Sequence, residues 1–382
     1  MTVNVTGINL STGAPYSAAA AGNGSTDDTT VLQNAINACG LIKLPAATYR
    51  TTAKLTFPII GAGGFVVAGG GIIGSGSGSC TIFADHTDTA VEANSGVTAQ
   101  GLTHRGYKIT RGSSAAAGGT FGLDIGAGTT LGGDTPDKCR LKDLILDGHN
   151  TGLRVSSTGW CRMVDITAIN NDLDGISLVA QWQTRNINSN NNGRYGFYMA
   201  GVLASGNSMG NYRGLSASGN GSHGLYATGA AIGIRLIDCN FSSNGGHGAL
   251  FDNVNNGFTN QLTNCVANSN TGGIGFYFSA NTSQNSLWGC SASGQTYGAY
   301  SDAPSIAING GTWNGNSAYG ILIATGKASI NGVTASSNLN GVGASAAVTN
   351  ISVTFTNASG STTPFDLAAA SGVYRNSNNP AP

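Results

Sequence analysis

From about residue 139 onward, the chain repeats a short phrase in which a small polar run and a glycine precede apolar residues at every second position. The marking glycines lie on average 23.6 residues apart. They are Gly152, Gly175, Gly196, Gly224, Gly248, Gly275, Gly298, Gly320 and Gly341. An apolar period of two predicts strands rather than helices. A repeat of this length without a helical period predicts one turn of a β-solenoid per repeat.

Two apolar columns follow these glycines, one residue and three residues after each of them. The first column is Leu153, Ile176, Phe197, Leu225, Ala249, Phe276, Ala299, Ile321 and Val342. The second is Val155, Leu178, Met199, Ala227, Phe251, Phe278, Ser301, Ile323 and Ala344. Side chains alternate between the two faces of a strand, so both columns are predicted to point into the core.

Another column, about ten residues before each glycine, contains only Asp, Asn and Gly. Its members are Asp143, Asp165, Asn186, Gly214, Asp238, Asn264, Gly289, Gly310, Gly332 and Asn350. These residue types tolerate left-handed backbone conformations, so the column predicts a stacked tight turn. The next residue is usually apolar, and in three repeats it is Cys239, Cys265 or Cys290. We therefore expect these cysteines to be small, buried, hydrophobic residues.

The N-terminal part predicts a helix within residues 22–39, followed by a strand, a turn and the start of a coil within 41–50. Ser25 or Thr26 would cap this helix, and Asp27 and Asp28 would lie in its first turn, near the positive end of the helix dipole.

This segment resembles the opening of the pectate-lyase-3 type of right-handed parallel β-helix, GDGxxDDTxAIQxAI followed by a strand and LPxGxY. The matching residues are Gly22, Gly24, Thr26, Asp27, Asp28, Thr29, Leu32, Gln33, Ala35, Ile36, Leu44, Pro45 and Tyr49. Asn23 and Ala47 depart from the family pattern. Proteins with this fold include polygalacturonases, uronan lyases, epimerases and bacteriophage tailspikes that cleave capsule or O-antigen glycans.

The resemblance and the repeats together imply an all-β, single-stranded right-handed parallel β-helix with an N-terminal capping helix. We expect a cap over residues 1–40, the β-helix over 41–370 and a tail over 371–382. Asp27 and Asp28 are then structural residues of the cap.

The composition of the chain argues against several classes of function. The 17 Lys and Arg residues balance 17 Asp and Glu residues, which argues against a protein that binds nucleic acid through excess positive charge. With 40% apolar residues the chain can form a core, and no apolar run is long enough for a membrane helix. The N-terminus shows no signal-peptide pattern. The resemblance nevertheless implies an extracellular or virion-surface location.

Two columns with outward parity contain the candidate site, and they include seven of the twelve tyrosines. They lie one residue before and two residues after each glycine. Tyrosine offers a broad apolar surface with a hydroxyl at its edge, which suits the faces of sugar rings. The alternative is that the tyrosines only protect the sheet or contact another subunit. The predicted substrate-binding residues are Arg154, Arg194, Tyr198, Tyr226, Tyr277, Tyr297, Tyr300 and Tyr319.

Four polar members of these columns occupy successive repeats: Asp174, Tyr195, His223 and His247. His223 and His247 should lie one strand apart, roughly 5 Å. Asp172 lies beside this group in the sequence. Carboxylates, phenols and imidazoles are the usual groups for proton transfer, so we predict these five residues as catalytic candidates.

Two reactions fit this set. Glycoside hydrolysis needs two carboxylates, for which Asp172 with Asp174 is the better pair and Asp252 a more distant one. β-Elimination from a uronic acid needs a base, a proton donor and a cation beside the carboxylate. His223 or His247, Tyr195 and Arg194 supply those types.

The sequence NDLDGI at 171–176 and the sequence GHG at 246–248 are similar to polygalacturonase motifs, but the paired aspartates of that family are missing between them. Calcium-assisted lysis would need more clustered acids than Asp172 and Asp174 provide, so calcium is only a secondary expectation and no cofactor is predicted.

We expect an enzyme that degrades a polysaccharide, similar to a tailspike depolymerase. The alternative is a non-catalytic glycan-binding adhesin or structural spike. Tailspikes are often trimers, so the resemblance to them suggests a homotrimer, although no C-terminal trimerisation segment is recognisable.

Overall fold

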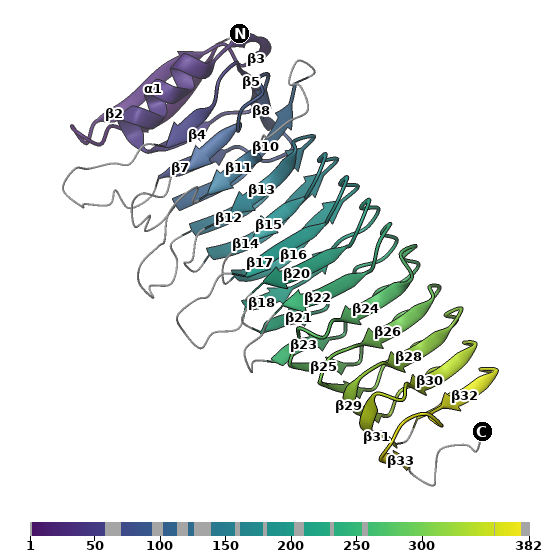
Figure 1. Cartoon of the computed structure of the whole chain (residues 1–382). Coiled ribbons are helices and arrows are strands. Elements are labelled where there is room, and N and C mark those ends of the chain that lie inside the picture. The colour runs from purple at the N-terminus through teal and green to yellow at the C-terminus, as the bar shows by residue number, and fades with distance from the viewer. Residues whose placement is uncertain are drawn as a thin grey trace. The chain divides into compact units, whose positions relative to one another are not determined.

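The computed structural model describes residues 2–57, 70–93, 102–112, 121–125, 139–156, 161–178, 182–201, 210–229, 233–253, 259–354 and 356–375. By their contacts, the residues form two compact units, Met1–Gly193 (unit 1) and Arg194–Pro382 (unit 2). Within each unit, strands far apart in the sequence pair in parallel, coil upon coil (Figure 1).

In unit 1 the strands form two sheets, A1 and B1. The strands of A1 are β1 (Val3–Ile8), β2 (Pro15–Ala20), β3 (Asn23–Asp27), β4 (Leu41–Leu44), β5 (Ala47–Thr51), β7 (Gly71–Gly74), β8 (Cys80–Ala84), β10 (Leu102–Arg111), β12 (Cys139–Asp147), β14 (Cys161–Ile169) and β16 (Trp182–Asn190). Those of B1 are β6 (Leu55–Phe57), β9 (Val91–Ala93), β11 (Phe121–Ile125), β13 (Thr151–Val155) and β15 (Ile176–Leu178). β1 pairs antiparallel with β2 and β4, and the later pairs are parallel.

Unit 2 likewise contains two sheets, A2 and B2. The strands of A2 are β18 (Gly210–Arg213), β19 (Leu215–Ser216), β21 (Ile234–Ile237), β23 (Thr259–Thr263), β25 (Gln284–Trp288), β27 (Ser305–Asn309), β29 (Gly326–Asn331), β31 (Val348–Thr354) and β33 (Val373–Arg375). Those of B2 are β17 (Phe197–Gly201), β20 (Leu225–Gly229), β22 (Ala249–Asn253), β24 (Ile274–Phe278), β26 (Tyr297–Ser301), β28 (Tyr319–Ile323), β30 (Asn340–Ala344) and β32 (Thr363–Asp366). β33 pairs in parallel with β31, so the coils continue beyond residue 370, where the sequence suggested a tail.

The N-terminal helix α1 (Thr29–Cys39) buries Leu32, Ala35, Ile36 and Cys39 against the first strands of unit 1. It starts later than predicted, because Asp28 is the residue at its N-cap and makes no side-chain capping bond. Instead, the carboxylates of Asp27 and Asp28 accept hydrogen bonds from nearby backbone amides. Asp28 accepts hydrogen bonds from the Ala21 and Gly22 amides, and Asp27 accepts one from the Thr29 amide. Neither Ser25 nor Thr26 caps the helix, but the structural interpretation of both aspartates agrees with these bonds.

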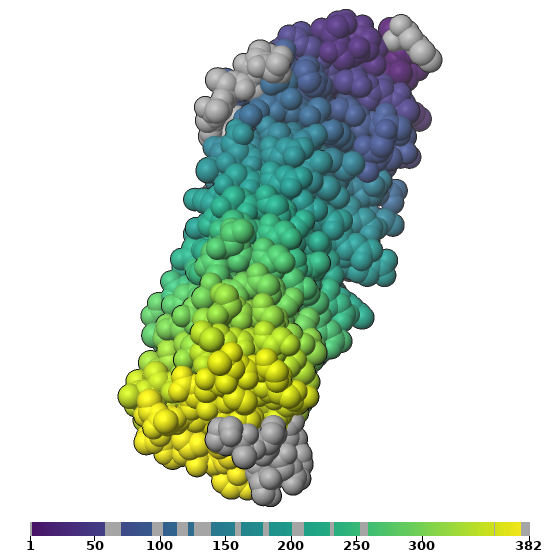
Figure 2. Space-filling model, turned by 90° about the vertical axis from the view of Figure 1, so that its right-hand side faces the viewer, coloured from purple at the N-terminus to yellow at the C-terminus, as the bar shows by residue number. Residues whose placement is uncertain are grey.

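The two predicted core columns are buried along their whole length. Every member of both columns is at most 5% exposed. Within unit 2 the first column is in direct register, with Phe197 beside Leu225, Leu225 beside Ala249 and Ala249 beside Phe276. Apolar side chains therefore stack on apolar side chains, beneath the outer surface that Figure 2 draws in space-filling form.

The predicted turn column is confirmed at nine of its ten positions, where φ lies between 51° and 66°. Asn350 is the exception, because it lies inside β31 and pairs with Lys327. A register shift between Gly326 and Lys327 displaces the pairing in this coil. Cys239, Cys265 and Cys290 follow turn residues and are at most 1% exposed, as expected for small core residues.

Rows of buried amides run along each unit and were not foreseen. In unit 1, Asn171 Nδ2 donates to Asn192 Oδ1 at 2.8 Å. In unit 2, Asn220 donates to Asn244 at 2.9 Å and Asn244 to Asn270 at 3.1 Å. Each side chain thereby satisfies a neighbour one coil away, which makes polar groups tolerable in the interior and fixes the register of the coils.

His104 should make unit 1 sensitive to acid. Its side chain is fully buried on β10, its Nδ1 lies 2.6 Å from the Tyr107 hydroxyl, and burial lowers its pKa to about 3. The unfolded chain binds a proton at this residue below about pH 6.5, and the folded chain does so only near pH 3. The free energy of unfolding should therefore fall as the pH drops from 6.5, by roughly 3 kcal/mol at pH 4.

Denaturant titrations of the wild type and of His104→Gln between neutral pH and pH 4 measure this effect. Glutamine does not titrate and can still hydrogen-bond Tyr107, so the variant should lose most of the difference. Equal pH dependence in the two proteins would show that His104 does not contribute.

Candidate functional site

The outer face of sheet B2 carries aromatic side chains on successive strands. We call this surface the aromatic face, and its members are Arg194, Tyr195, Tyr198, His223, Tyr226, His247, Tyr277, Tyr297, Tyr300 and Tyr319, all of them half-buried. The marking glycines allow the coils to approach closely behind it. A Cβ atom on Gly248 would lie 2.6 Å from the Gly275 carbonyl oxygen and 2.7 Å from Ala267 Cβ.

Three of the predicted catalytic residues form one column, which we call the Tyr–His stack: Tyr195, His223 and His247. The ring centroids of Tyr195 and His223 are 5.5 Å apart with the planes 7° from parallel. Those of His223 and His247 are 4.8 Å apart at 13°. This matches the spacing of one strand that the sequence predicted for the two histidines.

Burial lowers the pKa of both histidines. The pKa of His223 falls to about 4 because the ring is desolvated and lies beside His247. The pKa of His247 is lowered by desolvation, which a hydrogen bond to the Gly272 backbone partly opposes. Both rings are therefore neutral near pH 7, the form in which an imidazole can accept a proton.

The hydrogen bonds of the stack distinguish the two rings. His223 Nδ1 accepts a hydrogen bond from the His247 backbone amide at 2.9 Å, so the neutral His223 ring carries its proton on Nε2. His247 Nδ1 is enclosed and has no hydrogen-bond partner within the described part of the chain. A buried polar atom without a partner is uncommon in proteins.

Tyrosines continue the aromatic face on both sides of the stack. Tyr198 and Tyr226 lie 5.8 Å and 5.2 Å from the Tyr195 ring. Tyr277 packs edge-on against His247 at 5.6 Å and against Tyr300 at 5.3 Å. The Arg194 guanidinium lies 4.8 Å from the centre of the Tyr195 ring, in reach of a cation–π contact.

Carboxylates hold two of these tyrosines in place. The Tyr277 hydroxyl donates to Asp302 at 3.1 Å, and the Tyr319 hydroxyl donates to Asp366 at 2.6 Å. The pKa of each rises to about 12, for Tyr277 mainly through burial and for Tyr319 mainly through the bond to Asp366. Both phenols stay protonated, so they are suited to hydrogen bonding rather than to acting as bases.

The remaining predicted residues lie in unit 1 and have other partners. Asp174 is only 2% exposed, so the predicted outward orientation is wrong for this residue. Asp172 accepts a 2.8 Å bond from Arg111. Arg154 forms two bonds, at 2.9 Å and 2.5 Å, with the carboxylate of Asp124, which is 1% exposed.

Arg154 is therefore committed to a buried ion pair, in contrast to its predicted contact with substrate. Its guanidinium also lies 3.8 Å above the Phe121 ring. The carboxylate proposed as a more distant partner for hydrolysis, Asp252, is likewise engaged, by Ser279 at 2.6 Å and Asn281 at 2.7 Å.

Neither a metal centre nor a membrane helix is found in the described ranges. No group of three or more His, Cys, Asp or Glu side chains is arranged to hold a metal ion among the residues that the structure describes. The same part of the chain contains no helix that is long and apolar enough to cross a membrane.

Sequence reasoning missed a row of arginine and lysine side chains on sheet A1. Arg105, Lys142 and Arg185 occupy outward positions on β10, β12 and β16. Lys142 and Arg185 stand directly before the turn residues Asp143 and Asn186, which is a signal in the sequence. Arg105 could not be added to this row, because the coils before residue 139 could not be phased from the sequence.

Comparison with known proteins connects the chain to others by fold only. No family model matches the sequence, and no curated protein matches it. The A-module of mannuronan C-5 epimerase AlgE4 from Azotobacter vinelandii superposes with a TM-score of 0.54 at 18% identity, over 94% of this chain and 96% of that one.

Two further solved structures are similar. The periplasmic alginate epimerase AlgG has a TM-score of 0.56 at 11% identity, over 88% of this chain and 78% of that one. The catalytic domain of a GH87 α-1,3-glucanase in complex with tetrasaccharides has a TM-score of 0.56 at 12% identity, over 94% of this chain and 68% of that one. These likenesses confirm the predicted fold class, a right-handed parallel β-helix.

Proposed function

We propose that the chain is a carbohydrate-active enzyme that binds an extended polysaccharide along the aromatic face of unit 2. The observation that carries this proposal is the Tyr–His stack, in which two neutral imidazoles and a phenol lie ring on ring on an outer face. Aromatic rings with polar edges suit sugar rings, and the tyrosines on either side extend that surface. Neutral histidines beside them supply proton transfer.

The reaction that these groups fit best is removal of the proton at C5 of a uronic acid. His247 accepts this proton, and Arg194 lies beside the stack as the cation for the sugar carboxylate. In elimination, the electron pair of the broken C–H bond forms the C4–C5 double bond. The glycosidic oxygen then leaves from C4 with a proton from Tyr195 or from His223 Nε2. If Tyr195 or His223 Nε2 instead delivers a proton to the opposite face of C5, the glycosidic bond stays intact and the product is the epimer.

Hydrolysis by two carboxylates has less support. That mechanism requires two carboxyl groups that reach the scissile bond. Asp174 is buried, Asp172 is paired with Arg111, and Asp252 is held by Ser279 and Asn281. The carboxylates near the aromatic face, Asp302 and Asp366, are engaged by tyrosine hydroxyls.

The similar solved structures support a carbohydrate-active role, since two are alginate epimerases and one is a glucanase that binds tetrasaccharides. A tailspike-like depolymerase that is extracellular or on a virion surface, as a homotrimer, belongs to the same proposal. The alternative is a non-catalytic glycan-binding adhesin or structural spike, in which the aromatic face binds without turnover.

Incubation with bacterial capsules, alginate, pectate and neutral glycans tests the proposal. We would follow absorbance of the unsaturated uronate, reducing ends and, in deuterated water, label incorporated at C5. Absorbance with reducing ends identifies a lyase, label alone an epimerase, and reducing ends alone a hydrolase. Binding without any of these signals would support the adhesin.

A further inference from the structure

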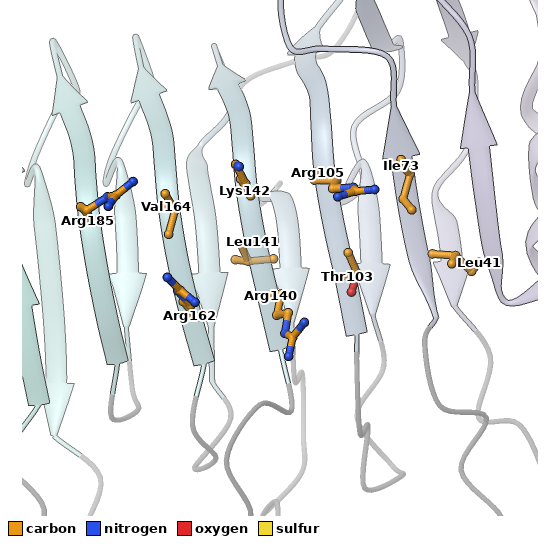
Figure 3. Close-up of a pocket in the computed structure, with 10 residues that line it drawn as sticks. All are labelled: Leu41, Ile73, Thr103, Arg105, Arg140, Leu141, Lys142, Arg162, Val164 and Arg185. Carbon is orange, nitrogen blue, oxygen red and sulfur yellow. The ribbon is translucent and has the colours of Figure 1, made fainter.

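A groove on the outer face of sheet A1, wholly within unit 1, encloses about 500 Å³. Ten residues line it, and Figure 3 shows them projecting from one series of neighbouring strands. Four of the ten are aliphatic and one is a threonine. The other five are basic, and we call this site the basic groove: Arg105, Arg140, Lys142, Arg162 and Arg185.

The strand register places these cations in two adjacent rows. Arg105 pairs in register with Lys142 on the next strand, and one strand separates Lys142 from Arg185, at Val164. In the second row, Arg140 pairs in register with Arg162. Neighbouring strands are about 4.8 Å apart, so the cations recur at intervals of one or two strand spacings along the groove.

Four of these cations differ from other cations of unit 1 in their partners. Five other cations of the unit are matched with carboxylates, in the pairs Arg50–Asp85, Lys54–Glu92, Lys108–Asp147, Arg111–Asp172 and Arg154–Asp124. Within the described residues, Arg105, Lys142, Arg162 and Arg185 form no such pair, and all four are exposed.

The acidic residues nearest to these cations in the sequence accept hydrogen bonds from other side chains. Asp143 accepts hydrogen bonds from Ser77, and Asp165 accepts one from Asn186. Unit 1 as a whole contains twelve Lys and Arg residues and thirteen Asp and Glu residues. The unit is therefore nearly neutral as a whole, and the cations of the groove create a local positive potential.

We propose that the basic groove binds an acidic glycan through its carboxylates. The planar fork of arginine matches a carboxylate with two parallel hydrogen bonds, and four of the five cations are arginines. The cations follow the groove across several strands, so they fit an extended chain with regularly spaced charges better than a single small anion. The aliphatic lining between them can cover the apolar faces of the sugar rings.

A single-stranded nucleic acid fits this groove less well. Proteins that bind single strands combine a basic channel with aromatic side chains on which the bases stack. None of the ten lining residues is aromatic. The proposal does not rest on the function proposed for the aromatic face, which lies on another sheet of the other unit.

The test is titration calorimetry of the whole chain with oligogalacturonate and oligomannuronate at low and moderate salt. A neutral malto-oligosaccharide and an oligothymidylate are the comparison ligands. The charge-removing variant is Arg162→Gln with Arg185→Gln, both at exposed positions. The matched control removes the same charge from exposed positions of sheet A2, as Arg235→Gln with Lys327→Gln.

We expect the wild type to bind an acidic oligosaccharide and not the neutral one. The groove variant should bind about tenfold more weakly, with a smaller salt dependence, and the control should bind as the wild type does. Trp288→Ala, which removes an exposed ring from sheet A2, should also leave this binding intact. The proposal is overturned if neither uronate binds, if the control loses as much affinity as the groove variant, or if oligothymidylate binds more tightly than both uronates.

Discussion

Replacing His247 with alanine should lower the turnover of an accepted glycan by about 10²- to 10⁴-fold, the usual contribution of a general base. The ring is half-buried, stacks on His223 at 4.8 Å and is neutral near pH 7 because burial lowers its pKa. Alanine removes the proton acceptor but leaves the tyrosines that hold the sugar. The loss should therefore appear in kcat, with a small change in KM.

The pH profile gives an independent measure of the same residue. Protonation removes the base, so the rate of the wild type should fall as the pH is lowered below neutral. The fall lies on the acid side of the ordinary histidine range, because burial lowers the pKa of His247 below its ordinary value. A profile that stays flat between neutral pH and pH 4 would contradict a histidine base.

Trp288→Ala is the matched control for this experiment. Trp288 is 53% exposed on β25 of sheet A2, so its removal deletes a larger ring without touching the aromatic face. Its turnover should equal that of the wild type. If His247→Ala, His223→Ala and Tyr195→Phe all keep wild-type turnover as well, the Tyr–His stack is a binding surface and the chemistry lies elsewhere.

Strand parity predicted most of the aromatic face but not the position of Asp174. The rule places the residue before each marking glycine outward, and this holds for the long side chains of Tyr195, His223 and His247. In unit 1 the same position is covered, at 2% exposure for Asp174 and 6% for Thr151. Tyr195, His223 and His247 also stand two residues before their strands, as Asp174 does, so the start of the strand does not explain the difference. The side chains of Asp174 and Thr151 are short and are covered, whereas the longer rings of the other three reach the surface.

The buried amide rows and the basic groove escaped the sequence analysis for a different reason. The amides of the buried rows stand three to five residues before a marking glycine, as with Asn338, Asn244 and Asn270, and this variable distance hides them from a fixed alignment. The basic groove depends on the register between β10 and β12, which pairs Arg105 with Lys142. The segment between them has no recognisable repeat, so only the folded chain shows that these residues are neighbours.

Replacing Arg154 with alanine should destabilise unit 1 rather than only weaken a ligand. Asp124 on β11 is 1% exposed, and the guanidinium of Arg154 on β13 forms two hydrogen bonds to its carboxylate. Removing one partner leaves the other charge buried without compensation, which costs about 3–5 kcal/mol in a fully buried pair. Because the Arg154 side chain is 34% exposed, we expect about 2–4 kcal/mol, measured by denaturant unfolding.

A second substitution separates the charge from the lost packing over Phe121. Adding Asp124→Asn to the Arg154→Ala variant replaces the stranded carboxylate with a neutral amide, which is far cheaper to bury. The double variant should therefore recover a large part of the lost stability, while Asp124→Asn alone should cost less than Arg154→Ala. If Arg154→Ala unfolds at the wild-type denaturant concentration and only its affinity for glycans falls, the residue contacts substrate as the sequence suggested, and the ion pair with Asp124 does not stabilise the fold.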